Sequence, residues 1–229
     1  MTIVANDTPR YSNLVKHEYF PEQGFCKKAV TYYGAAGAIG VGAVLGAYVD
    51  TPTITPGTMV GTGNATGGTA SVTAHKDLKI GTYIVNMLTA TTFVVIDPNG
   101  AAIGTGATTV AFKASGLVFT ITAGATPAVA GDTLPIVIGG TVKYKLVEDT
   151  ATDGTQVPKV IVVGNAQGQP LPTTAVVNTD TTFLVLYRGP CMVGEDALVY
   201  GASVAAGAET TAMNVLLTAN SGIDVLAQI

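Results

Sequence analysis

Short runs of strand-forming residues, separated by turn-forming residues, constrain the fold of this chain most strongly. Between residues 57 and 139 the runs read SVTA, GTYIVNML, TTFVVID, LVFTIT and LPIVI. Gly, Pro, Asn or Asp bounds each run, and DPNG at 97–100 is a strong turn signal. Only 11% of residues are charged, and the abundant Thr, Val, Ala and Gly suit short strands better than helices. This segment therefore predicts a β-sandwich or a small barrel.

The flanking segments have a different pattern. TVKYKLVED alternates cleanly from residue 141, and KVIVVGN is a continuous apolar run. Further strands are predicted in TTFLVLYRGP, EDALVYG and IDVLAQI. One helix is predicted in AETTAMNVLLTAN (208–220), which the following Ser and Gly end. Because the pattern at 141–163 continues that of 29–50, we predict one discontinuous domain into which a second domain is inserted.

The predicted organisation is an N-terminal arm at 1–25, a discontinuous core at 26–55 and 140–229, and an inserted domain at 56–139. The prolines of TPTITPGT mark the first boundary. The predicted fold class is mainly β: a small β-rich core with one short helix, plus an Ig-like β-sandwich.

A glycine-rich stretch at 32–50, YYGAAGAIGVGAVLGAYVD, admits three interpretations. A membrane span needs about 20 mostly apolar residues, and the uncharged run here is shorter and rich in glycine. Gly40, Gly42 and Gly46 form a pattern one residue longer than the dinucleotide fingerprint, and the TPTITPGT that follows is unsuited to the helix this fingerprint requires. We therefore expect backbone that turns, bulges or packs closely in an all-β setting.

The net charge limits the classes of partner that we expect, and the two cysteines raise the question of a disulfide. The net charge is −4 and no Lys/Arg cluster occurs, so neither direct nucleic-acid binding nor membrane binding is expected. For Cys26 and Cys191 we expect two reduced thiols in a protein made in the cytosol. A disulfide would require two distant parts of the chain to meet.

Residues that could perform catalysis are scarce. His17 and His75 are the only histidines, and neither lies in a catalytic or metal-binding motif, so we expect both on the surface. Two acidic pairs are adjacent in sequence, which in a strand directs the two side chains to opposite faces: Glu148 with Asp149, and Glu195 with Asp196. We predict no enzymatic activity, no cofactor and no metal.

Residues 1–25 mix charge, proline and aromatic residues without a clear period. This composition predicts an extended arm. A frayed terminus without a role is the alternative, but it would carry fewer apolar side chains than this segment does: Tyr11, Leu14, Tyr19, Phe20 and Phe25.

The outer segments together resemble a known family. They read KKAVTYYGAAGAIGVGAVLG, KYKLVEDTATDGTQVPKVIVVGN, TTFLVLYRGPCMVGEDALVYG and SGIDVL. A glycine-rich strand with a GxVLG-like end, a D-G-T turn before an apolar strand, and an aromatic-basic-glycine strand before an acidic pair occur in this order. The order resembles the head decoration proteins of tailed phages, the lambda-like capsid-stabilising or cement class.

This resemblance implies a small β-tulip-like core that forms homotrimers at the three-fold positions of the expanded capsid. It places the protein on the outer surface of the virion, where it stabilises the shell against internal DNA pressure. It implies that residues 1–25 bind the major capsid protein by strand addition, with Tyr11, Leu14, Tyr19 and Phe20 as anchors. Gly42 and Gly46 would then allow close strand packing in the core, near the trimer axis.

The inserted segment resembles a β-module that recurs in phage structural proteins, with a G-T-Y strand, a D-P-x-G turn and A-G-D before its last strand. Two alternatives follow from it: a tail or baseplate component, or an adhesin that binds host-surface glycans through the insert. The insert has no tryptophan, and its aromatic residues are Tyr83, Phe93, Phe112 and Phe119. Three of these four fall in apolar runs that predict core packing.

Overall fold

A computed structural model of the chain describes residues 14–18, 25–33, 39–165 and 179–226. The chain divides into two compact units, the first made of residues 1–48 and 143–229 and the second of residues 49–142. Both are built mainly from strands, and the described residues contain one α-helix, so the prediction of a mainly β fold is confirmed. No helix in these ranges is long and apolar enough to cross a membrane.

The centre of the first unit is a small closed barrel. Its strands follow the order β2 (Lys27–Tyr32), β12 (Thr181–Leu186), β11 (Pro158–Asn165), β3 (Val44–Pro56) and β10 (Thr133–Leu146). A parallel pairing of Tyr144 with Tyr32 joins β10 back to β2 and closes the barrel. The interior is filled by side chains that alternate along these strands, among them Val30, Leu45, Val160, Val162, Phe183 and Val185.

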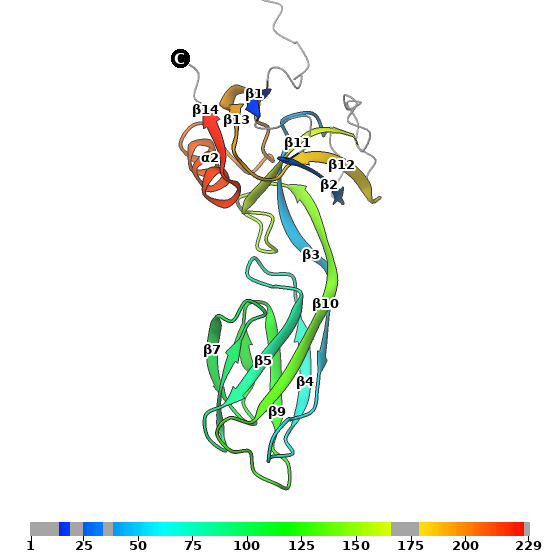
Figure 1. Ribbon diagram of the computed structural model, residues 1–229, viewed down its shortest axis with the longest axis vertical. Coiled ribbons are helices and arrows are strands. Elements are labelled where there is room, and N and C mark those ends of the chain that lie inside the picture. The colour runs from blue at the N-terminus through cyan, green and yellow to red at the C-terminus, as the bar shows by residue number, and fades with distance from the viewer. Residues whose placement is uncertain (1–13, 19–24, 34–38, 166–178, 227–229) are drawn as a thin grey trace, which may run out of the picture. The chain divides into compact units, whose positions relative to one another are not determined.

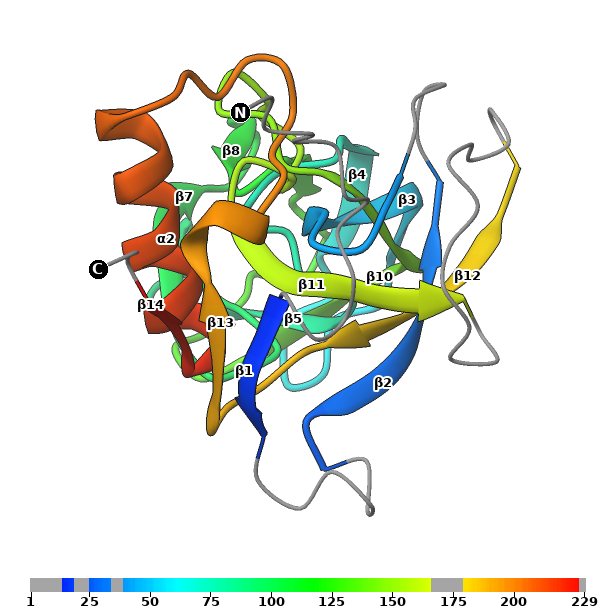
Figure 2. The same cartoon turned by 90° about the horizontal axis from the view of Figure 1, so that it is seen from above.

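A second layer covers one side of this barrel (Figure 2). It consists of a three-stranded sheet in the order β1 (Val15–Glu18), β13 (Cys191–Gly194) and β14 (Ile223–Leu226), with helix α2 (Ala208–Ser221). The helix ends at Gly222, whose φ of 69° is left-handed and whose N–H reaches the carbonyl of Thr218. The apolar side chains between the layers include Leu14, Val44, Ile161, Leu186, Val193, Leu217 and Ile223.

The second unit is a β-sandwich (Figure 1). One sheet has the order β10, β5 (Gly81–Met87), β6 (Thr92–Ile96) and β7 (Ala102–Ala107). The other has β4 (Thr66–Val72), β9 (Leu117–Thr122) and β8 (Phe112–Ala114). Buried side chains of both sheets meet in one core, where three phenylalanine rings lie with centroids 5.0 to 6.1 Å apart: Phe93, Phe112 and Phe119. The predicted sandwich character is confirmed.

The unit boundaries differ from the predicted ones. The predicted breaks at 55/56 and 139/140 fall inside β3 and β10, because each of these strands continues without interruption from one unit into the other. Strand β3 also runs through Pro52 and Pro56. Strand β3 pairs with β11 only from Val44 to Gly46. The two prolines lie beyond this pairing, so β11 loses no hydrogen bond through their lack of an N–H group.

Two further differences concern glycine and acidic residues. Strand β7 is not predicted from the sequence, because Gly104 and Gly106 weaken the strand pattern. An added Cβ at Gly104 would lie 3.1 Å from the Phe112 ring, so glycine at this position leaves space for the aromatic core. The expected strand at EDALVYG begins instead with a short 3-10 helix (Glu195–Ala197), and the strand before it, β13, spans Cys191–Gly194.

Candidate functional site: the outer sheet of the first unit

Strand β1 forms one edge of the outer sheet. It pairs antiparallel with β13 through Val15 with Val193 and Glu18 with Cys191, and the register shifts between Val15 and His17. In the part of the chain that the structure describes, β1 has a strand partner on one side only. An edge of this kind offers backbone N–H and C=O groups to an added strand.

Two contacts hold β1 in the first unit. Leu14, directly before the strand, is fully buried in the layer between barrel and outer sheet. At the other end, Glu18 forms an ion pair with Lys27 at 2.9 Å, and the Glu18 side chain is only 4% exposed. Strand β1 is therefore packed against its own unit and connected to the first barrel strand.

The structure differs from the sequence expectation at Leu14. This residue was expected to be a capsid-binding anchor in an extended arm, but its side chain is buried within its own unit because it fills the apolar layer beside Val193 and Ile223. The other expected anchors, Tyr11, Tyr19 and Phe20, lie outside the described residues.

At the opposite edge of the sheet, helix α2 and β14 border an open groove of about 470 Å³. Its lining is Glu195, Thr211, Asn214, Val215, Thr218, Ala219 and Val225. Val215, on the helix, is 64% exposed. The groove is mostly apolar and therefore suits contact with an apolar surface more than a chemical reaction.

Two of the lining residues, Glu195 and Asn214, belong to a chain of side-chain hydrogen bonds. The Tyr200 hydroxyl donates to Asn214 Oδ1 at 2.6 Å, and Asn214 Nδ2 donates to Glu195 Oε1 at 2.9 Å. Burial, followed by the Glu195 carboxylate, raises the pKa of Tyr200 well above its ordinary value. Sequence reasoning missed this groove. Of the two adjacent leucines of α2, Leu216 is exposed and Leu217 is buried.

The two glycines singled out from the sequence pack against backbone of their own unit. An added Cβ at Gly42, where φ is 91°, would overlap the carbonyl oxygen of Ala197. An added Cβ at Gly46 would overlap the backbone of Thr155. Their location at a subunit interface stays a prediction, since the intrachain packing already requires glycine at both positions.

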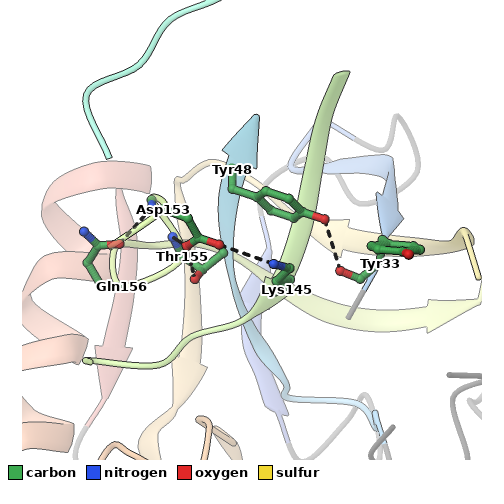
Figure 3. A network of polar contacts seen from close by, with 7 residues as sticks. Tyr33, Tyr48, Lys145, Asp153, Thr155 and Gln156 are labelled. Carbon is green, nitrogen blue, oxygen red and sulfur yellow. Dashed lines mark hydrogen bonds and ion pairs between the residues drawn. The ribbon is translucent and has the colours of Figure 1, made fainter. Parts of the chain in front are cut away.

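The turn that meets Gly46 is part of a polar network (Figure 3). Asp153 Oδ1 accepts hydrogen bonds from the Thr155 backbone N–H at 3.0 Å and from the Thr155 hydroxyl at 2.6 Å. Lys145 Nζ donates to Asp153 Oδ2 at 3.3 Å and lies 4.0 Å from the centroid of the Tyr48 ring. Although partial burial raises the pKa of Asp153, the Thr155 hydrogen bonds and the Lys145 ammonium together hold it below the ordinary value.

The histidines and acidic pairs do not assemble a catalytic arrangement. His17 is exposed on β1, and His75 belongs to the other unit, where its Nδ1 accepts the Asp77 backbone N–H at 3.2 Å. Glu148 accepts the backbone N–H groups of Ala202 and Ser203, which ties two loops together. Within the described ranges, no three His, Cys, Asp or Glu side chains are grouped as they would be to hold a metal ion.

The aromatic residues of the second unit all lie in its core. Tyr83 and Phe93 are fully buried, and Phe112 and Phe119 are at most 5% exposed. A glycan-binding platform usually stacks sugars on exposed aromatic rings, and this unit, which is described throughout, presents none on its surface.

No protein-family model matches this chain. A search of curated proteins also found no match. Among solved structures, a crystal structure of Xanthomonas campestris FlgL aligns with 47% of this chain and 33% of its own at 26% identity and a TM-score of 0.29. A second crystal form aligns with 48% and 32% at 23% identity and a TM-score of 0.26. The chain thus spans about a third of the length of FlgL, and TM-scores of this size do not indicate a shared fold.

Proposed function

We propose that this chain is a head decoration protein of a tailed phage. In this proposal it binds the outer surface of the expanded capsid as a trimer at three-fold positions and stabilises the shell against the pressure of the packaged DNA. The partner is the major capsid protein, and binding requires neither a cofactor nor a covalent bond.

One observation carries the proposal. The segments that resemble decoration proteins are separated by the whole second unit, yet they supply the barrel and outer sheet of a single compact unit. Two of their motifs also meet: the glycine that ends GAVLG packs against the D-G-T turn, at Gly46 and Thr155. An ordered set of motifs that builds one structural unit is stronger support than the same motifs scattered over two.

Strand addition is the proposed mode of attachment. Strand β1 comes directly after the N-terminal residues in the sequence, and one of its edges is open. A strand of the capsid protein that pairs with this edge, or with N-terminal residues that continue β1, gains main-chain hydrogen bonds. Three such attachments on one trimer reinforce one another through effective concentration. Binding only to the expanded lattice then stabilises that lattice by mass action.

The test is co-sedimentation of the purified chain with expanded capsids that lack it. The matched chain lacks residues 1–13 and so keeps Leu14 and β1, whose removal would disturb the first unit. We expect the full chain to saturate near three copies per three-fold position. The shortened chain should bind at least tenfold more weakly while its melting temperature is unchanged.

The alternatives give different results in the same assay. A tail or baseplate component would bind capsids in neither form and would assemble into six-fold or tubular particles, visible by negative-stain microscopy. A chain that binds with equal affinity with and without residues 1–13 would contradict attachment through the arm, although not decoration itself.

A further inference from the structure

The two cysteines, distant in sequence, lie in the same buried layer of the first unit. Cys26 is 0% and Cys191 is 1% exposed, and both belong to the apolar cluster between barrel and outer sheet. Both are free thiols in this structure. Cys26 lies immediately before β2, and Cys191 is the first residue of β13.

The backbone around the two thiols places them side by side. The Cys26 thiol donates to the carbonyl oxygen of Pro190, the residue directly before Cys191, at 3.5 Å. The Tyr187 N–H donates to the carbonyl oxygen of Cys26 at 3.0 Å, so β2 and the segment that leads into β13 are held together on both sides of the thiol. The Cys191 thiol donates to the carbonyl oxygen of Arg188 at 3.7 Å, in the same short segment that Cys26 contacts through Pro190 and Tyr187.

We propose that Cys26 and Cys191 form a disulfide when the protein meets an oxidising small-molecule disulfide, and that this bond fastens the outer sheet to the barrel. The inference is independent of the proposed function. It goes beyond the sequence expectation of two reduced thiols by adding a second, oxidised state of the same pair.

The reaction is a thiol–disulfide exchange with an oxidant such as oxidised glutathione. One cysteine thiolate attacks a glutathione sulfur, breaks the glutathione S–S bond and releases one reduced glutathione. The second thiolate attacks the mixed disulfide, forms the Cys26–Cys191 bond and releases the second. The protein loses two electrons and two thiol protons, and the two glutathione thiols gain them.

The environment of the thiols makes this reaction slow in the closed fold. Burial, then the Glu18 carboxylate, raises the pKa of Cys26. Burial, then the neighbouring Cys26 thiol, raises the pKa of Cys191 to about 12. The charged groups that face the pair are Glu18 on β1, Lys27 on β2, Arg188 before β13 and Asp224 on β14. Because only the thiolate reacts, oxidation should accelerate as pH rises and when β1 opens.

Strand β1 covers one end of the pair, since Glu18 lies opposite Cys191 in the sheet. We expect Leu14→Ala, which removes the buried side chain that holds β1, to accelerate oxidation at least tenfold. The matched variant Lys16→Ala alters an exposed residue of the same strand and should leave the rate within twofold of wild type.

The experiment treats the full chain with oxidised glutathione at pH 8 and follows intact mass, free thiols and melting temperature. The expected product is lighter by two hydrogens and remains monomeric on a non-reducing denaturing gel. Trypsin should release peptides 17–27 and 189–229 joined by the disulfide. The closed loop contains the whole second unit, so a long-loop disulfide should raise the melting temperature by roughly 10 °C.

Two outcomes would overturn the proposal. One is that the folded chain forms only glutathione adducts, whereas the urea-unfolded chain forms the disulfide under the same conditions. The other is a bond between separate chains. Cys191→Ser should give only the adduct at Cys26 and no rise in melting temperature. If that variant does not fold, the peptide map of the wild type still decides the question.

Discussion

At the scale of single residues, the glycines of GAVLG matter because they lack a Cβ atom. Gly46 has no left-handed φ, so its requirement is steric: the Thr155 backbone occupies the space that a Cβ would need. Gly40, six residues earlier in the same stretch, has nothing within 4 Å of its Cβ position. The sequence alone could not separate these two glycines, because both lie in the same apolar pattern.

This difference gives a direct prediction for stability. Gly46→Ala should lower the free energy of unfolding of the first unit by about 3 kcal/mol, because a methyl group forced against backbone must displace the turn at Asp153–Thr155. Gly40→Ala is the control and should change it by less than about 0.5 kcal/mol. Urea denaturation of both variants measures the effect, and equal midpoints would contradict the steric account.

Asp132 is a second residue whose role the sequence only hinted at. Asp132 ends the A-G-D sequence that precedes the last strand of the insert, and its buried carboxylate organises this loop. Oδ2 accepts the N–H groups of Val129 and Gly63 at 2.9 and 2.8 Å, and Oδ1 accepts that of Thr62 at 2.9 Å. These hydrogen bonds, with Val129 first, hold the pKa of Asp132 below its ordinary value.

The pH dependence of stability follows from this direction. A carboxyl whose pKa is lower in the folded state contributes stability above its unfolded pKa of about 3.9, and this contribution is lost as pH falls through the folded value. Asp132→Asn cannot accept all three N–H groups and should lower the melting temperature by several degrees at pH 7. The difference in melting temperature between this variant and the wild type should become smaller below about pH 4 in thermal scans. A difference that stays constant down to pH 2 would exclude the ionised carboxylate as its cause.

At the scale of elements, the sequence predicted strands well where alternation was clear and poorly where glycine or an end effect intervened. Strands β5, β6 and β9 follow apolar runs with buried alternate residues, and they were predicted. Strand β7 was missed because its glycines serve the aromatic core of the sandwich. Strand β1 was missed because one buried residue, Leu14, decides its position, and four residues show no period.

The candidate site was less predictable than the fold for the same reason. A strand is an edge strand when it has a partner on one side only. For β1 this partner is β13, which lies more than 170 residues later in the chain. The groove beside α2 depends on β14 lying next to β13. No local pattern contains either fact.

At the scale of the whole molecule, each core is confined to one unit. The sandwich cluster contains only residues between Val49 and Ile138, and the two clusters of the first unit contain none of them. Since no buried cluster is shared, each unit has the apolar core that independent folding requires. Strands β3 and β10 each run from one unit into the other.

Removing the second unit should therefore leave the first one folded. The Val147 N–H donates to the Val44 carbonyl at 3.0 Å, and Gly140 lies against Val49 and Asp50, so β3 and β10 run antiparallel across the cut. Joining Tyr48 to Lys143 through Asn-Gly replaces residues 49–142 by a hairpin turn. We expect this shortened chain to unfold cooperatively and to bind expanded capsids within threefold of the full chain, because the proposed attachment lies wholly in the first unit. A folded hairpin chain that no longer binds would assign capsid attachment to the sandwich instead, whereas an unfolded one would show that the barrel depends on the sandwich for stability.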